Sequence, residues 1–338
     1  NENENKFVKG LMQSEMSISP VTEDIVSLGA SAAAQILDEE DKKNIDMVIV
    51  GTESGVDQSK ASAVFIHHLL NIQPFARCIE IKEACYGATA ALSFAKNYIE
   101  KNNDASVLVI ASDIARYGID TPGESTQGAG SIAMLIKKDP AIAIINDENV
   151  CQTRDIMDFW RPNYSDFPYV DGHFSTKQYL DCLTTTFDEY KKRYNQSLDD
   201  FDAFCFHLPF PKLGLKAINS ILEKNIEKEI KNDFLEKFHA SIIYGKRVGN
   251  IYTGSLYLSL LSLLENCVNL NGGDKIGMYS YGSGAVCEFF NLTLAEGFKN
   301  HLRCDRLNDF ENRKQLSMEE YENMFFEKIV LDEEGNCD

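Results

Sequence analysis

A three-part order of elements that occurs twice along the chain constrains the fold most. Each copy has a short apolar strand that ends in a polar residue, a turn into a helix rich in small residues, and a second strand with a glycine-rich continuation. Alternating strands and helices are typical of an α/β protein. The copies predict two similar halves, 1–150 and 151–338, although such matches also arise by chance. The first copy covers 46–54, 84–102 and 106–113, and the second copy covers 201–210, 248–266 and 275–290.

The polar residues of the two copies are the first candidates for a functional site. Glu53 and Cys85 follow strands of the first copy, and His207 and Asn250 belong to the second. Ligands of open α/β sheets bind at the ends of such strands. If the two halves are built alike, we expect these four side chains to lie near one another.

Local patterns predict several further elements. Ser19 and Pro20 are typical of a helix start, and the helix is expected to run to residue 37. A second helix is expected at 57–70, a hairpin at 131–145, and a late helix at 317–329 with a capping box of Ser317 and Glu320. The aromatic segment 151–173 has no clear period, so it is either a lid over a site or a structural connector.

Charge and composition exclude some classes of partner. The formal net charge of -19 argues against nucleic acid and against an anionic membrane surface, both of which attract clustered Lys and Arg. No apolar run reaches the ~18 residues that a membrane span needs. The nine cysteines include no C-x-x-C pair, which favours reduced thiols over a disulfide framework or a zinc site. We therefore expect a cytoplasmic protein.

Cys85 is the candidate nucleophile. It lies between a predicted strand and a helix that begins Tyr-Gly-Ala-Thr-Ala. A helix N-terminus stabilises a thiolate, so the pKa of this thiol is expected to be lowered, and backbone N–H groups there can bind a thioester oxyanion. The alternative is that Cys85 is a small buried apolar residue, as most cysteines are.

His207 and Glu53 are candidates for acid–base work. His207 ends an apolar run, where an imidazole can donate or accept a proton or a hydrogen bond. Burial at the strand end would raise the pKa of Glu53 and make it a base. Each residue also has an ordinary interpretation, as a core histidine and as a solvated loop glutamate.

Two lysines and a glycine-rich loop complete the local signals. Lys212 and Lys216 share one face of a predicted helix, where they would suit CoA phosphates or simply form a solvated face. The glycines of 280–284 suit close approach of the backbone to a ligand. Neither a G-x-G-x-x-G nor a Walker pattern is present, so nothing indicates a dinucleotide or ATP site.

Together these segments resemble the 3-hydroxy-3-methylglutaryl-CoA (HMG-CoA) synthases of the thiolase-like condensing enzymes, particularly the bacterial mevalonate-pathway type. The resemblance runs from about Phe7 to Tyr321. It implies an αβαβα layered fold of two similar halves, a homodimer, and no metal or redox cofactor, with CoA thioesters as substrates. The segments that carry it are IVGTESGVD, IQPFARCIEIKEACYGAT, ARYG with TQGAG, DFWRP, CFHLPFPKLGLKA, VGNIYTGSLYLSLLSLLEN and SYGSGAV.

The resemblance also implies a role for each matching residue. Cys85 would carry the acetyl group, Glu53 would be the general acid/base, and His207 would orient acetoacetyl-CoA. Lys212 and Lys216 would bind CoA. Substrate-binding positions would be Asn250, Ser283, Tyr117, Gly282 and, on less distinctive sequence, Tyr321. The implied reaction joins acetyl-CoA to acetoacetyl-CoA with water to give HMG-CoA and CoA, a step of isoprenoid biosynthesis.

Other functions remain open at this point. A ketoacyl synthase also uses Cys and His, but decarboxylative condensation needs no carboxylate base, so Glu53 argues against it. A synthase that acts on carrier-bound groups in polyketide β-branching would keep every residue, and a non-catalytic acyl-CoA-binding scaffold is a remote alternative. The sequence departs from the family in lacking about one strand before Phe7 and further residues after Asp338. Without that strand, an edge of a sheet would be left unpaired.

Overall fold

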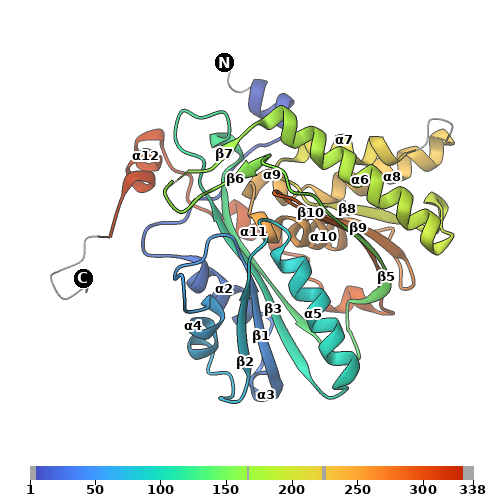
Figure 1. Ribbon diagram of the computed structural model, residues 1–338, viewed down its shortest axis with the longest axis horizontal. Helices are drawn as coiled ribbons and strands as arrows, with labels where there is room; N and C mark the ends of the chain where they lie inside the picture. Colours follow the sequence, from blue (N-terminus) through green and yellow to red (C-terminus); the bar gives the residue numbers. More distant parts are fainter. Residues whose placement is uncertain (1–4, 166, 223–225, 330–338) are drawn as a thin grey trace.

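The computed structural model describes residues 5–165, 167–222 and 226–329, which form five layers of helices and sheets (Figure 1). Two four-stranded sheets enclose a central layer of two helices, α5 (Gly87–Lys101) and α10 (Ser255–Asn266). On the outer face of the first sheet lie α2 (Ile25–Ala34) and α4 (Ser62–Leu69). This αβαβα order confirms the fold class that the sequence predicted. The second sheet is covered by α6 (Gly172–Tyr194) and α7 (Pro211–Ile221), while α8 (Lys228–Ser241) packs against β8 and α10.

The first sheet has the order β2-β1-β3-β4. Strands β1 and β2 are parallel, with Met47 opposite Arg77, and β1 is also parallel to β3. β4 is antiparallel to β3. β1 and the first part of β3 are buried on both faces, as expected for strands enclosed by helices. The strands are β1 (Ile45–Gly51), β2 (Arg77–Ile81), β3 (Ser106–Ala115) and β4 (Gly128–Ile136).

The second sheet repeats this plan in the order β5-β10-β9-β8. β8 is parallel to β9, and β9 is antiparallel to β10, as β1 is to β3 and β3 to β4. The three-part repeat read from the sequence therefore corresponds to β1, α5 and β3 in one half and to β8, α10 and β9 in the other. The strands are β5 (Ala143–Thr153), β8 (Ala203–Phe206), β9 (Lys275–Gly282) and β10 (Val286–Leu294).

The predicted hairpin at 131–145 is wrong. β4 pairs with β3 in the first sheet, whereas β5 pairs with β10 in the second. Residues 137–142 carry the chain from one sheet to the other. The partner of β5 lies about 140 residues further along the chain, so the local pattern could not reveal it.

Two predicted helices begin later than expected. The side chain of Asp24 accepts hydrogen bonds from the N–H groups of Val26 and Ser27, so Asp24, rather than Ser19, caps α2. Asp57 accepts the N–H groups of Ser59 and Lys60 and closes a turn, which delays α4 to Ser62. At the first helix a downstream Asp replaces the predicted cap, and at the second the predicted first residue closes a turn instead of starting the helix.

The irregular segment 151–173 contains the end of β5, a small hairpin of β6 (Phe159–Trp160) and β7 (Tyr169–Val170), and the start of α6. At the other end of the chain, α12 (Met318–Phe326) has the predicted capping box of Ser317 and Glu320. None of the helices within the described ranges has the length and apolarity to cross a membrane. The remaining elements are η1 (Asn5–Leu11), α3 (Glu39–Asn44), η2 (Glu124–Thr126), η3 (Leu198–Asp200), α9 (Gly245–Val248), η4 (Tyr252–Gly254), η5 (Phe298–His301) and α11 (Arg306–Glu311).

Candidate active site

Cys85 and Glu53 are in direct contact. The Cys85 thiol donates a hydrogen bond to Glu53 Oε1, with 3.2 Å between the sulfur and the oxygen. Cys85 lies in the turn between β2 and α5, and Glu53 lies just beyond the end of β1. Because these parallel neighbours end at the same edge of the sheet, two residues 32 positions apart meet there.

The turn that carries Cys85 is tightly packed. Gly51, at the end of β1, leaves only 2.4 Å between an added Cβ and the N–H of Ala88 in α5. From the other half, Gly282 packs on the same turn, where a Cβ would lie 2.6 Å from the carbonyl oxygen of Glu83. Neither position has room for a side chain. The close packing fixes the thiol between the ends of the two sheets.

Burial changes the acid–base properties of this pair. Removal from water, and then the neighbouring Asp113 carboxylate, raises the pKa of Glu53 to about 8. Burial and the Glu53 carboxylate raise the pKa of the Cys85 thiol well above its ordinary value. The lowered pKa expected from the helix N-terminus is therefore wrong for this resting state. The structure pairs a neutral thiol with a carboxyl group that exchanges protons near neutral pH.

Asp113, at the end of β3, connects the Glu53 segment to the second half. Its Oδ1 accepts hydrogen bonds from the Thr52 hydroxyl and the Glu53 N–H at 2.8 and 2.9 Å. Its Oδ2 accepts the N–H and hydroxyl of Thr253 at 3.0 and 2.5 Å. Asp113 was not among the residues predicted from the sequence, although it lies in the predicted strand 106–113. Asp113 holds the backbone of Glu53 against the turn that precedes α10.

Tyr117 and Asn250 form a second contact between the halves. Asn250 Nδ2 donates to the Tyr117 hydroxyl at 2.9 Å, and Asn250 Oδ1 accepts the N–H of Tyr252. The ring of Tyr117 packs edge-on against that of Tyr252, with centroids 6.0 Å apart. Burial raises the pKa of the Tyr117 hydroxyl, and charges on Cys85 and Glu53 act in the same direction. Tyr252, also missed from the sequence, has a buried hydroxyl without a hydrogen-bond partner among the described residues.

His207 is buried directly after β8, and its backbone N–H donates to the carbonyl of Tyr279 in β9. Its carbonyl accepts the Tyr179 hydroxyl at 2.8 Å. Burial lowers the pKa of the imidazole to about 3, so the ring is neutral at physiological pH. Nδ1 has no hydrogen-bond partner among the described residues. The residue is positioned by its backbone and can offer a hydrogen bond, but it carries no charge.

Segment 151–173 reaches the site through two residues of the DFWRP motif. Buried Asp158 accepts the N–H of Gly284 at 2.9 Å and the Tyr281 hydroxyl at 2.7 Å, which anchors the loop that contains Gly282 and Ser283. Arg161 donates to the carbonyl oxygen of Glu53. Asp158 and Arg161 belong to the DFWRP motif, but neither residue was assigned a role from the sequence. A segment without periodicity does not indicate where its side chains lie.

The remaining predicted site residues lie further out. Lys212 is partly exposed and Lys216 exposed on α7, and neither makes an ion pair with a described residue. Ser283 is partly buried in the loop between β9 and β10. Tyr321, on α12, is buried and hydrogen-bonds to Glu124 and Gln127.

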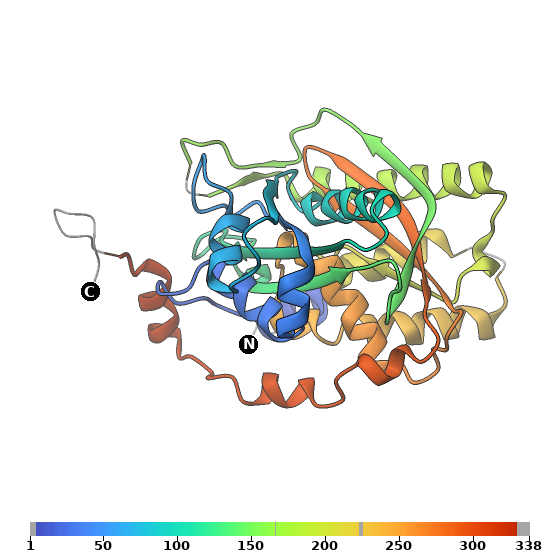
Figure 2. The same cartoon turned by 90° about the horizontal axis from the view of Figure 1, so that it is seen from below.

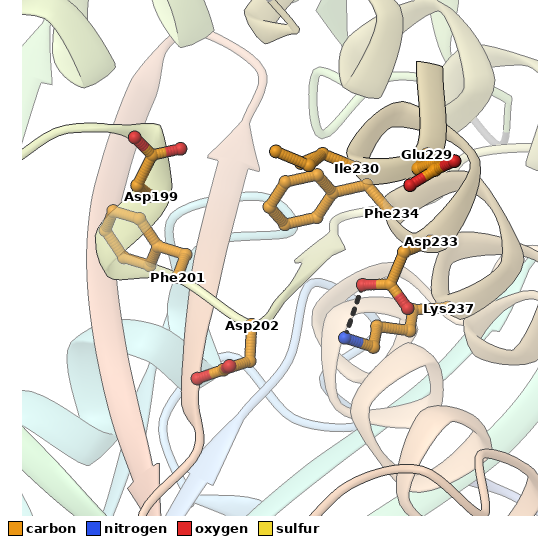
Figure 3. A pocket seen from close by; sticks show the side chains of 8 residues that line it. All are labelled: Asp199, Phe201, Asp202, Glu229, Ile230, Asp233, Phe234 and Lys237. Atoms are coloured by element: carbon orange, nitrogen blue, oxygen red, sulfur yellow. Dashed lines mark hydrogen bonds and ion pairs between the residues drawn. The ribbon is translucent and has the colours of Figure 1, made fainter. Parts of the chain in front are cut away.

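A surface cavity of about 540 Å³ is separate from these residues. Phe201 and Asp202, at the amino end of β8, line one side, and Ile230 and Phe234 of α8 line the other (Figure 3). Lys237 forms an ion pair with Asp233 there, at 2.6 Å. His207 follows the opposite end of β8, a strand of four residues, or roughly 13 Å. The cavity contains none of the predicted site residues.

Comparisons with known proteins agree with this geometry. Sequence models of the N-terminal and C-terminal regions of hydroxymethylglutaryl-coenzyme A synthases match residues 1–141, and 144–222 with 214–333. The chain is 50% identical to the hydroxymethylglutaryl-CoA synthase of Enterococcus faecalis over 97% of its own length and 85% of that enzyme's. It is 33% identical to a polyketide-biosynthesis 3-hydroxy-3-methylglutaryl-ACP synthase of Bacillus subtilis, over 94% of this chain and 80% of that one.

Solved structures give the same result. A crystal structure of an HMG-CoA synthase complexed with CoA matches with a TM-score of 0.97 and 61% identity, over 99% of this chain and 86% of that one. A synthase in complex with 3-hydroxy-3-methylglutaryl-CoA matches with a TM-score of 0.87 and 31% identity, over 97% and 87% of the two chains. This chain belongs to the hydroxymethylglutaryl-CoA synthase family.

Proposed function

We propose that the protein condenses acetyl-CoA with acetoacetyl-CoA and water to give HMG-CoA and CoA, the carbon–carbon bond-forming step of the mevalonate pathway. The observation that carries the proposal is the Cys85–Glu53 contact, which pairs a sulfur nucleophile with a carboxyl group of raised pKa. The 50% identity to an HMG-CoA synthase supports the same assignment.

In the first step, Cys85 takes the acetyl group. Its sulfur forms a thioester with the acetyl carbon of acetyl-CoA, the bond to the CoA sulfur breaks, and the thiol proton ends on the departing CoA. The N–H groups at the start of α5 are suited to bind the oxyanion of this step.

In the second step, Glu53 removes a proton from the acetyl methyl group. The resulting carbon attacks the ketone of acetoacetyl-CoA, and a neutral His207 donates a hydrogen bond to that substrate. The protonated Glu53 can return its proton to the new alkoxide, which a pKa of about 8 allows near neutral pH. Water then hydrolyses the Cys85 thioester and releases HMG-CoA. No step changes the oxidation state of the substrates overall, so the scheme needs no redox cofactor and uses no metal.

Most of the other predicted residues would bind substrate. Tyr117 and Asn250 would line the acyl pocket with Gly282 and Ser283, and Lys212 and Lys216 would contact CoA phosphates, whereas buried Tyr321 would act through its neighbours. The Tyr117–Asn250 hydrogen bond next to the reactive pair supports the pocket assignment. For the lysines, the support is their position on α7, just past His207.

We also propose a cytoplasmic homodimer built from two thiolase-like halves, residues 1–150 and 151–338. The eight cysteines in the described residues are all free, which suits a reducing compartment. Within those residues, β2 pairs on only one side, and exposed Phe75 and Phe94 lie just before it and on the helix that follows it. An edge strand with neighbouring apolar groups suits self-pairing about a two-fold axis. Sedimentation should give twice the chain mass, and Phe94→Glu should shift the protein toward monomer.

One assay tests the reaction. Purified protein is mixed with acetyl-CoA and acetoacetyl-CoA, and the products are analysed by mass spectrometry for the six-carbon HMG-CoA. A parallel reaction replaces acetoacetyl-CoA with acetoacetyl carrier protein, because one relative is an HMG-ACP synthase. Product from the free thioester supports the proposal. Product only from the carrier-bound form would assign the chain to polyketide branching, and no product from either would leave an acyl-CoA-binding scaffold.

A further inference from the structure

The C-terminal helix α12 lies over the first half, far from the elements that precede it in sequence. The chain leaves α11 near the central helices, runs along the edge of the molecule and ends in α12 beside the loops at the carboxyl ends of the strands (Figures 1 and 2). The capping box of Ser317 and Glu320 fixes the start of the helix, and Lys314 pairs with Glu320 at 2.8 Å. Part of the second half thus contacts the segment that carries Tyr117.

The contact is a chain of hydrogen bonds that ends at Tyr117. The Tyr321 hydroxyl donates to Glu124 Oε1 at 2.9 Å and accepts from Gln127 Nε2 at 3.1 Å. The other end of the Gln127 amide, Oε1, accepts the N–H of Tyr117 at 2.7 Å. A Gln amide has one donor end and one acceptor end. Because Glu124 accepts the hydroxyl proton, the Tyr321 oxygen faces the donor end of the amide, and the acceptor end faces Tyr117.

Burial and packing support this arrangement. Tyr321 and Gln127 are each only 4% exposed, whereas Met318 on the same helix is 67% exposed. Phe325 stacks on Phe167 of segment 151–173, with ring centroids 6.4 Å apart and the planes at 8°. The guanidinium of Arg116, the neighbour of Tyr117, lies 5.4 Å from the centre of the same Phe325 ring.

We propose that Tyr321 is a positioning residue for the condensation, acting through Gln127 on Tyr117 rather than by contact with substrate. The hydrogen bond from Asn250 holds the hydroxyl end of Tyr117, and the Gln127 bond holds its backbone. Loss of the Tyr321 hydroxyl leaves the Gln127 amide free to turn, which presents an N–H to the N–H of Tyr117. This inference rests on the proposed function, since its readout is the rate of the same reaction.

The test is Tyr321→Phe, which keeps the buried ring and removes only the hydroxyl. We expect kcat to fall about 10-fold, the effect of one lost hydrogen bond, with the KM for acetoacetyl-CoA and the melting temperature little changed. Tyr164→Phe is the matched control, because Tyr164 is 84% exposed and makes no hydrogen bond with a described residue.

A second variant separates positioning from general packing. Gln127→Met removes the link, so adding Tyr321→Phe to it should cause no further loss of kcat. Additive losses, an unchanged kcat, or a rise in KM alone would overturn the inference, the last by showing direct substrate contact. If the unmodified protein makes no HMG-CoA, the proposed function itself fails. If it is active and Tyr321→Phe has the kcat of the unmodified protein, or if its loss adds to that of Gln127→Met, only the role of Tyr321 fails.

Discussion

The turns that precede the two central helices share a non-glycine residue of positive φ and differ in chemistry. Ala84 has φ of 42° and Tyr252 has φ of 41°, and each lies three residues before the start of its helix, α5 or α10. A non-glycine residue with positive φ is strained, so its occurrence at matching positions reflects a shared requirement of the turn. The next residue is Cys85 in the first half and Thr253 in the second.

Cys85 and Thr253 occupy matching positions, but Cys85 is the proposed nucleophile and Thr253 holds the two halves together. The Thr253 hydroxyl donates to Asp113 at 2.5 Å and lies 2.9 Å from the carbonyl oxygen of Gly51, so it binds the halves together. Among the described residues, the Cys85 thiol donates its hydrogen bond to the Glu53 carboxyl group. The matching turns thus carry the proposed nucleophile in one half and a structural anchor in the other. The first half supplies groups that exchange protons, and the second supplies neutral hydrogen-bond donors such as His207.

The largest effect is expected from Cys85→Ala. If the nucleophile comes from the first half alone, turnover should fall about 10⁴-fold or more and no acetyl group should be found on the protein by mass spectrometry. Thr253→Ser keeps the hydroxyl and should retain most activity. An acetylated Cys85→Ala protein would show that the reactive sulfur lies elsewhere.

Glu53→Gln should separate the two chemical steps. Condensation should fall roughly 100- to 10,000-fold because the general base is gone. Acetylation of Cys85 should persist, because the carboxylate that raises the thiol pKa is also removed. Glu83→Gln is the control, since Glu83 is in the same turn but makes no hydrogen bond to the thiol. Normal condensation by Glu53→Gln would refute the base assignment.

His207→Gln should affect the second substrate more than the first. We expect the KM for acetoacetyl-CoA to rise on the order of 10-fold, the value of a hydrogen bond, while Cys85 acetylation changes little. Because burial lowers the pKa of His207 to about 3, the wild-type rate should show no ionisation of this residue between pH 5 and 8. His239→Gln on α8 serves as the control. A histidine-dependent inflection in that range would mean that the ring carries a proton during turnover.

Asp113→Asn should displace the pH profile of the condensation, and the hydrogen bonds that its amide nitrogen cannot accept should lower the rate as well. The Asp113 charge helps to raise the pKa of Glu53, and the base form of Glu53 dominates only above that pKa. Condensation should therefore increase with pH through about 8 in the wild type. Without the neighbouring charge this rise should move to lower pH, by on the order of one unit. An unmoved profile would show that burial alone sets the pKa.

The sequence could predict an element where its interactions are local, and not where its partner lies far along the chain. β1, β3 and α5 were recognised from local patterns because burial on both faces leaves long apolar runs. The passage of the chain from the first sheet to the second at 137–142 could not be recognised. The strand that pairs with β5 is β10, which lies about 140 residues further along the chain.

The residues of the candidate site also differ in whether the sequence could predict them. Cys85 and Glu53 occur in distinctive motifs, and their contact follows from neighbouring parallel strands. Asp113, Asp158 and Arg161 act through partners that lie 60 or more residues away or in a segment without periodicity. Their type gives no indication of those partners. The Cys85 pKa was predicted with the wrong sign because a helix terminus is local, whereas the opposing burial and carboxylate depend on the complete fold.

The hydrogen bonds of Asp113 have a consequence for how the protein matures. The carboxylate reaches Glu53 on one side and Thr253 on the other, 140 positions from it in sequence. Glu53, the proposed base, can take this position only after the segment that carries Thr253 has been synthesised and packed against the first sheet. A partly folded chain carries the thiol without a positioned base, so we expect it to be unable to complete the condensation even where the thiol takes up an acetyl group.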